Sequence, residues 1–202
     1  NTDPINVYNE WIDHKWLNRK RGDKVDKKTQ SMSLFLAYLG VKKKFSNLVH
    51  HTILLGPRYK GLLKDIFSKK TLADDFSLYL HAPTVTDQSL GPEGCETFYV
   101  LSPVPNNQSG ISWESRKDEY LEKIYQSLET RLLPSLKENL EVSLSVTPSY
   151  FEKDLQSTSG SAFGIEPSFQ QSAYFRFHNQ SPDVKGLYFV GANTHPGAGV
   201  PG

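Results

Sequence analysis

The stretch GLYFVGANTHPGAGVPG, which covers residues 186–202, is the most informative part of the sequence. Its apolar run at residues 187–190 predicts a buried strand, and a glycine-rich loop follows directly. Glycine lets a backbone approach a ligand closely and adopt positive φ angles. Because a strand that leads into such a loop is a common cradle for a phosphate or a nucleotide, we predict a cofactor-binding loop here.

The last part of this stretch, residues 197–202, formally matches the pattern G-x-G-x-x-G. In dinucleotide-binding proteins that pattern lies directly between a strand and a helix, and an acidic residue follows about 20 positions later. Here residues 191–196 separate it from the predicted strand, and the sequence stops at Gly202. We therefore interpret it as a second cofactor-contacting loop. We also expect the chain, which starts at Asn1, to be a piece of a larger protein.

The composition excludes several classes of protein. The chain has 202 residues, 37% hydrophobic residues and a formal net charge of +1, so no global field attracts nucleic acid. The single Cys95 excludes an internal disulfide and fits a reducing, cytoplasmic compartment. His50 and His51 are adjacent and are expected to point to opposite sides of a strand, which favours a structural role. We predict no metal site, and the sequence sets no oligomeric state.

Basic residues are concentrated in two places near the start of the chain. One interpretation is an ordinary solvated surface, and the other is contact with anionic lipid headgroups, where each basic residue adds about 1 kcal/mol. The residues concerned are Lys15, Arg19, Lys20, Arg21, Lys24, Lys27 and Lys28, and then Lys42, Lys43 and Lys44.

Hydrophobic periodicity predicts a mostly antiparallel sheet of about four strands with a helix on one face. The run at 32–41 predicts a strand buried on both faces, and 48–55 predicts its hairpin partner. Val142, Leu144 and Val146 alternate with polar residues and indicate a further strand. The other expected strands are 76–80 and 97–102, and the expected helices are 8–18, 59–69, 113–139 and 150–155.

Four blocks of the sequence resemble bacterial-type phytoene desaturases, which are flavin-dependent carotenoid desaturases. The blocks occur in the same order as in that family, and the similarity runs from about Gln30 to the end. One departure is Asn193, where the family usually has glycine; Asn tolerates the left-handed region better than most residues. The blocks are GPRYKGLLKDIF (56–67), DDFSLYLHAPTVTDQSLGPEGCETFYVLSPVPN (74–106), GSAFGIEPSFQQSAYFRFHN (160–179) and 186–202.

The resemblance implies an α+β fold, a mostly antiparallel sheet with flanking helices, as in the substrate domain of flavin-dependent amine-oxidase-like enzymes. Residues 1–180 would form that substrate-binding domain, with its ends partly in the FAD domain. Residues 181–202 would be a returning strand and glycine-rich loop of the FAD domain. The implied FAD contacts are Gly191, Ala192, Asn193, Thr194, Gly199, Val200 and Pro201.

The implied substrate is phytoene, a long hydrocarbon that FAD desaturates toward lycopene. Such a substrate needs an apolar channel with few polar groups, and aromatic residues suit its wall. The candidates are Phe163, Phe169, Tyr174 and Phe175, although from the residues alone we favour ordinary core for each of them, because aromatic side chains are more often part of the core. We assign no catalytic acid or base, and we favour a structural role for His195 over that of a general base.

Three functions stay open from the sequence. The first is an FAD-dependent phytoene desaturase, cytoplasmic and peripheral to the membrane, whose isolated fragment is expected to be inactive. The second is a related carotenoid desaturase, isomerase or ketolase. The third is a non-catalytic carotenoid- or lipid-binding module that has kept the fold.

Overall fold

The computed structural model describes residues 3–17, 25 and 27–199, which form two compact units. The sheet unit contains residues 34–105 and 109–147. The loop unit contains the described residues of 1–33, 106–108 and 148–202. The predicted boundary between residues 180 and 181 concerns the domains of a larger enzyme and stays a prediction.

The sheet unit is built on a five-stranded sheet in the order β2-β3-β4-β1-β5. The neighbouring pairs β1 and β5, β2 and β3, and β3 and β4 run antiparallel. This confirms the predicted α+β class with its mostly antiparallel sheet. The strands are β1 (Ser33–Val41), β2 (His51–Leu54), β3 (Leu78–His81), β4 (Glu96–Val104) and β5 (Leu140–Val146).

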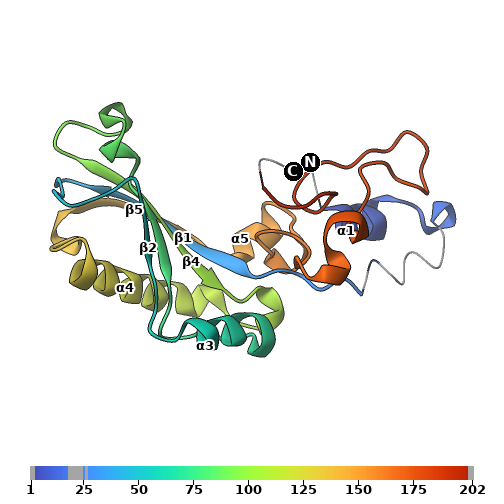
Figure 1. Ribbon diagram of the computed structural model, residues 1–202, viewed down its shortest axis with the longest axis horizontal. Coiled ribbons are helices and arrows are strands. Elements are labelled where there is room, and N and C mark those ends of the chain that lie inside the picture. Colours follow the sequence, from blue (N-terminus) through green and yellow to red (C-terminus); the bar gives the residue numbers. More distant parts are fainter. Residues whose placement is uncertain (1–2, 18–24, 26, 200–202) are drawn as a thin grey trace. The chain divides into compact units, whose positions relative to one another are not determined.

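Helices cover one face of this sheet (Figure 1). The long helix α4 (Trp113–Arg131) buries an apolar stripe against the strands, as the 3.6-residue spacing predicts. It ends three residues before Pro134, where the missing amide would break the helix, and a 3₁₀ turn (Lys137–Asn139) follows. Helix α3 (Tyr59–Lys64) continues as a π turn, Asp65–Lys69. Further 3₁₀ turns are Pro83–Val85, Gln88–Leu90 and Asn107–Ser109.

The predicted hairpin between 32–41 and 48–55 is wrong. β2 pairs with β3, with Ile53 opposite Tyr79, and β1 lies between β4 and β5. β1 is apolar on both faces and occupies the interior of the sheet, whereas the four-residue β2 is partly exposed and forms its edge. The sheet also has five strands rather than about four.

The face of the sheet opposite α4, called here the open face, is apolar and aromatic. Cross-strand register places its side chains together, because Tyr38 lies opposite Leu144 and Tyr79 lies opposite Leu101. Leu144 is 64% exposed and Ile53 is 69% exposed, although both are large apolar residues. The open face consists of Tyr38, His51, Ile53, Tyr79, His81, Tyr99, Leu101, Val142 and Leu144.

The loop unit has little regular structure and its own small core. Asp3 caps its first helix by accepting a hydrogen bond from the Ile5 amide at 3.0 Å. The core contains Ile5, Val7, Tyr8, Val25, Ile165 and Phe189. Its helices and turns are α1 (Pro4–Asn6), a π turn (Val7–Trp11), α5 (Pro148–Lys153) and the 3₁₀ turns His14–Trp16, Thr158–Gly160, Phe169–Gln171 and Ala173–Phe175.

The predicted buried strand at 187–190 is not a regular strand in the described part of the chain. Tyr188 forms a single bridge with Gln180, and Phe189 alone of the four is fully packed, against Tyr8. Tyr188 and Val190 point outward, and no neighbouring strand extends the bridge within the described residues. No helix among the described residues is long and apolar enough to cross a membrane.

Candidate functional site

The loop that follows residue 190 is closed by Thr194. The Thr194 amide and hydroxyl both donate to the carbonyl oxygen of Gly191, at 3.1 and 2.8 Å. The next amide, of His195, donates to the carbonyl of Phe177 at 2.7 Å. Gly191 has a φ of 128°, which side chains rarely permit, so a glycine is required where this turn begins. The loop is thus a closed turn fixed to residue 177.

Asn193 turns its side chain into the protein. Its Oδ1 accepts a hydrogen bond from the Ile165 amide at 2.6 Å, and the residue is only 8% exposed. Gly164 lies against it: a Cβ on Gly164 would stand 1.7 Å from Asn193 Oδ1. The asparagine at position 193 therefore has a structural explanation, because Gly164, with a φ of 68°, leaves room for its side chain.

A buried arginine holds the loop in place through hydrogen bonds to its backbone. Arg176 is 4% exposed, and its Nε and Nη2 donate to the carbonyl of Ala192 at 3.1 and 2.7 Å. Nη2 also donates to the carbonyl of Ile165 at 3.1 Å. Burial lowers the pKa of the guanidinium from its ordinary value, but a guanidinium stays charged at neutral pH. No sequence pattern predicts this role, because Arg176 lies within an aromatic run whose contacts depend on the tertiary fold.

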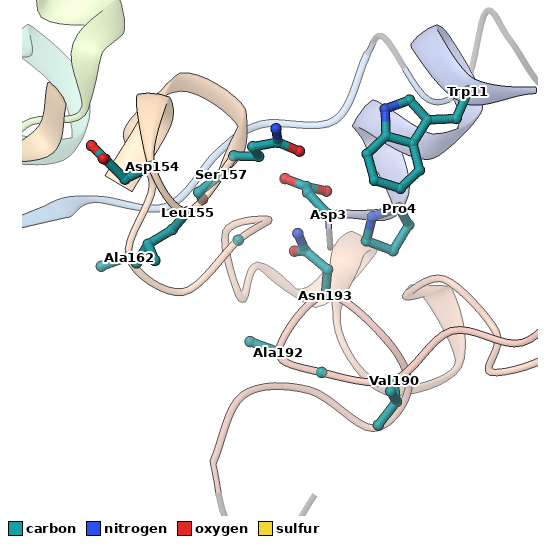
Figure 2. A pocket seen from close by; sticks show the side chains of 13 residues that line it. Asp3, Pro4, Trp11, Asp154, Leu155, Ser157, Ala162, Val190, Ala192 and Asn193 are labelled. Atoms are coloured by element: carbon teal, nitrogen blue, oxygen red, sulfur yellow. The ribbon is translucent and has the colours of Figure 1, made fainter. Parts of the chain in front are cut away.

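A pocket of about 440 Å³ opens beside the loop. Figure 2 shows Ala192 and Asn193 on one side of it and Asp3, Pro4 and Trp11 on another. Within the described residues, the amides of Gly191, Ala192 and Asn193 have no hydrogen-bond partner. Successive free amides suit an electron-rich ligand such as a phosphate or a flavin edge. The carboxylate of Asp3 already accepts from the amides of Ile5 and Thr158, so its charge is partly compensated. The donor set of this loop therefore fits FAD.

The other predicted cofactor contacts are spread along the loop. Thr194 is buried and closes the turn, whereas Gly199 is exposed. Val200 and Pro201 lie outside the described residues. These assignments stay predictions.

The predicted channel residues are all exposed and none belongs to a buried core. Phe169 is 89% exposed and Tyr174 is 71% exposed. Phe175 contacts both rings, at centroid distances of 6.4 Å to Phe169 and 5.9 Å to Tyr174. Phe163 is also exposed, on the segment whose carbonyl accepts from Arg176. Within the described residues these four side chains are therefore not part of a buried core, and the channel assignment stays a prediction.

The sequence does not predict the arrangement of two groups of residues. The open face of the sheet unit is one of them: the alternation at 142–146 indicates a strand but not that β5 is exposed along most of its length. The expectation that His50 and His51 point to opposite sides of a strand is wrong. His50 lies in a bend before β2, and the two ring centroids are 4.4 Å apart.

Comparison with known proteins gives a consistent result. The chain is 46% identical, over its whole length, to a lycopene-forming phytoene desaturase of Pseudescherichia vulneris. It is 44% identical to a lycopene-forming enzyme of a Paracoccus species and 45% identical to a neurosporene-forming phytoene desaturase of Rhodobacter capsulatus, again over the whole chain. The chain spans 41%, 40% and 39% of the lengths of these three relatives, respectively.

No protein-family model matches the chain. The alignments to individual enzymes nevertheless cover the whole chain. Over its whole length the chain is therefore similar to phytoene desaturases, and it spans about two-fifths of the length of the relatives it matches.

Proposed function

We propose that this chain is part of an FAD-dependent oxidoreductase that desaturates phytoene toward lycopene in carotenoid biosynthesis. The observation that carries the proposal is the 46% identity, over the whole chain, to an enzyme named for that reaction. Relatives of nearly equal identity are named for lycopene and for neurosporene as products, so the proposal does not extend to the number of desaturation steps.

The cofactor proposal rests on the loop of residues 191–199. The amides of Gly191, Ala192 and Asn193 would bind oxygen atoms of FAD, and Arg176 and Asn193 would keep the loop in shape. When bound, FAD accepts a hydride from the hydrocarbon. The protein's part is to hold the cofactor loop rigid and to keep the carbonyl of Ala192 turned inward, on Arg176. We propose that residues 181–202 belong to the FAD domain of the whole enzyme.

The substrate proposal rests on two exposed apolar surfaces. Phytoene has no hydrogen-bonding group, so it can be recognised only by apolar and aromatic contact. The open face of the sheet unit offers such contact, with the rings of Tyr38 and Tyr99 5.3 Å apart and uncovered Leu144 beside them. A large exposed apolar patch is uncommon on a soluble protein and marks a binding surface. The aromatic group of Phe169, Tyr174 and Phe175 offers a second one.

We also propose that the protein is cytoplasmic and contacts membrane lipid peripherally, since a hydrocarbon substrate resides in the bilayer. The lysines at 42–44 give limited support. Lys43 donates to the carbonyl of Pro134 at 2.7 Å and lies over the Phe45 ring, and Lys44 lies 3.9 Å from Glu96. Of these three lysines, Lys42 alone has no side-chain partner within the described residues, so it is the one left for lipid headgroups. Arg19, Lys20, Arg21 and Lys24 lie outside the described residues.

The experiment is a desaturation assay of the whole enzyme that contains this chain, with FAD and phytoene in liposomes. Products are separated by chromatography and identified by absorbance. We expect longer-wavelength polyenes to form only when FAD is present. Bound flavin without conversion of phytoene would overturn the substrate, and a related carotenoid would then be tested. Absence of flavin binding would overturn the enzyme proposal and favour a binding module.

A further inference from the structure

Three histidines meet at the edge of the sheet unit. His51 in β2 lies directly opposite His81 in β3, so both side chains lie on the open face. His50 lies in the bend just before β2, and its ring centroid is 4.7 Å from that of His81. One ring nitrogen from each of the three residues lies within 4.8 Å of the others. Imidazole nitrogens converge here from two segments that are 30 residues apart in the sequence.

The separation of two of these nitrogens is close to that in a metal site. Nε2 of His50 and Nε2 of His81 are 2.9 Å apart, so without an ion one of them must donate a proton to the other. Zinc–nitrogen bonds of about 2.0–2.1 Å in a tetrahedral site hold two nitrogens about 3.3 Å apart. The two rings need to separate by only about 0.4 Å to accept an ion between them.

The outer nitrogens of two rings are already engaged. Nδ1 of His50 pairs with the Thr86 hydroxyl at 2.5 Å, and Nδ1 of His51 pairs with the Tyr79 hydroxyl at 2.7 Å. Such outer contacts orient ligating histidines and select the tautomer that offers the other nitrogen.

We propose that His50, His51 and His81 form a binding site for a divalent transition-metal ion, zinc in the first place. Three imidazoles suit zinc, copper and nickel rather than magnesium or calcium, which prefer oxygen ligands. Three protein ligands leave a fourth position of a tetrahedral ion for water or another small ligand. A bound ion would tie the short edge strand β2 to β3 and to the bend that precedes it.

The test uses the purified enzyme without a histidine tag, freed of metal by a chelator. Zn²⁺ is titrated by calorimetry at pH 7.5, and Co²⁺ is used as a spectroscopic probe, because low-coordinate Co²⁺ absorbs strongly in the visible range. We expect one Zn²⁺ per chain in this site and a strong Co²⁺ band. His51→Gln and His81→Gln should each weaken Zn²⁺ binding by at least about tenfold, as loss of a metal ligand requires.

His178→Gln is the matched control, because His178 is exposed and lies in the loop unit. It should leave both signals unchanged. Far-ultraviolet circular dichroism checks that the variants fold, and His51 is exposed enough for His51→Gln to keep the sheet intact. Unchanged Zn²⁺ affinity in folded His51→Gln, or a Co²⁺ spectrum of the weak octahedral type in the unaltered protein, would overturn the site.

Discussion

Oδ1 of Asn193 lies 2.6 Å from the backbone nitrogen of Ile165 and accepts its hydrogen bond. A side chain of the proposed cofactor loop thus completes the backbone hydrogen bonding of a segment almost thirty residues earlier. Gly164, which directly precedes Ile165, has no side chain that could obstruct this contact. The shape of the loop and the identity of residue 164 therefore depend on each other.

This dependence can be measured with a double-mutant cycle. Gly164→Ala should lower the free energy of unfolding by at least about 3 kcal/mol, because its Cβ would overlap Asn193 Oδ1. Asn193→Gly alone should cost about 1–3 kcal/mol, since the Ile165 amide loses its partner. In the double variant, the alanine should cost only the left-handed penalty of about 1–2 kcal/mol.

Urea unfolding gives the three free energies, and Gly186→Ala serves as the control. Gly186 has a φ of 83° but nothing within 4 Å of its Cβ position, so only the backbone penalty applies. Additive effects of the two substitutions would contradict the interlock between residues 164 and 193.

Arg176→Met should destabilise the loop unit and weaken FAD binding. The substitution leaves the carbonyls of Ala192 and Ile165 without their charged donor, and hydrogen bonds to charged groups contribute about 1.5–3 kcal/mol each. We expect a loss of about 3 kcal/mol in unfolding free energy and a dissociation constant for FAD at least about tenfold higher. Fluorescence quenching of the flavin measures the latter.

Arg116→Met is the control for this change, because Arg116 is half exposed and pairs with Glu119 at 3.2 Å on the surface of α4. Its loss should change stability by no more than about 0.5 kcal/mol. Equal effects of the two arginine substitutions would refute the supporting role of Arg176.

Leu144→Lys should reduce phytoene conversion without unfolding the protein. Leu144 is 64% exposed on the open face, so a lysine there introduces charge on the proposed apolar contact surface at little cost to stability. We expect at least about a tenfold fall in kcat/KM for phytoene, because a desolvated charge opposes an apolar ligand. Leu63→Lys on α3, where Leu63 is 37% exposed, is the same chemical change off this face. Full activity of the Leu144 variant would remove the open face from the substrate site.

Asp65→Asn should reduce the sensitivity of the fold to acid. The hydrogen bond from Lys69, at 2.6 Å, and that from Arg58, at 3.1 Å, lower the pKa of the Asp65 carboxyl from its ordinary value. A lowered pKa in the folded state stabilises the protein above the unfolded pKa of about 3.9, and this contribution is lost as the pH falls further. The urea concentration at the midpoint of unfolding is measured between about pH 5 and pH 3, a range that brackets this pKa. As the pH falls, the midpoint should decrease less steeply in the variant than in the unaltered protein.

Asp118→Asn, at an exposed position of α4, is the control and should follow the unaltered protein. Identical slopes for Asp65→Asn and the unaltered protein would contradict the assignment.

Local sequence patterns predicted the individual helices and strands well, but they predicted poorly which strands pair with each other. The stripe on residues 113–131 and the apolar run at 33–41 specify a helix and an interior strand by themselves. Pairing depends on contacts far along the chain, so the assumption that successive strands form a hairpin failed for β1 and β2. Similarly, alternation in β5 indicates a strand but does not reveal that Val142 and Leu144 face outward.

In the candidate site, only the cofactor loop at residues 191–199 could be predicted from the sequence, because the glycine pattern and the family resemblance both indicate it. The inward turn of Asn193 depends on Gly164, and the role of Arg176 depends on carbonyls from two other segments. The histidine cluster was hidden for the same reason, since its geometry arises from the register of His51 opposite His81. None of these contacts leaves a local pattern in the sequence.

The position of β1 in the sheet also has a consequence for biosynthesis. β1 leaves the ribosome first, but its neighbours β4 and β5 begin only at residues 96 and 140. Until β5 has been synthesised, the nascent chain carries a strand that is apolar on both faces and has an unpaired edge. A translation product that ends before residue 140 is therefore expected to aggregate or to occupy chaperones, whereas one that includes residue 146 can complete the sheet.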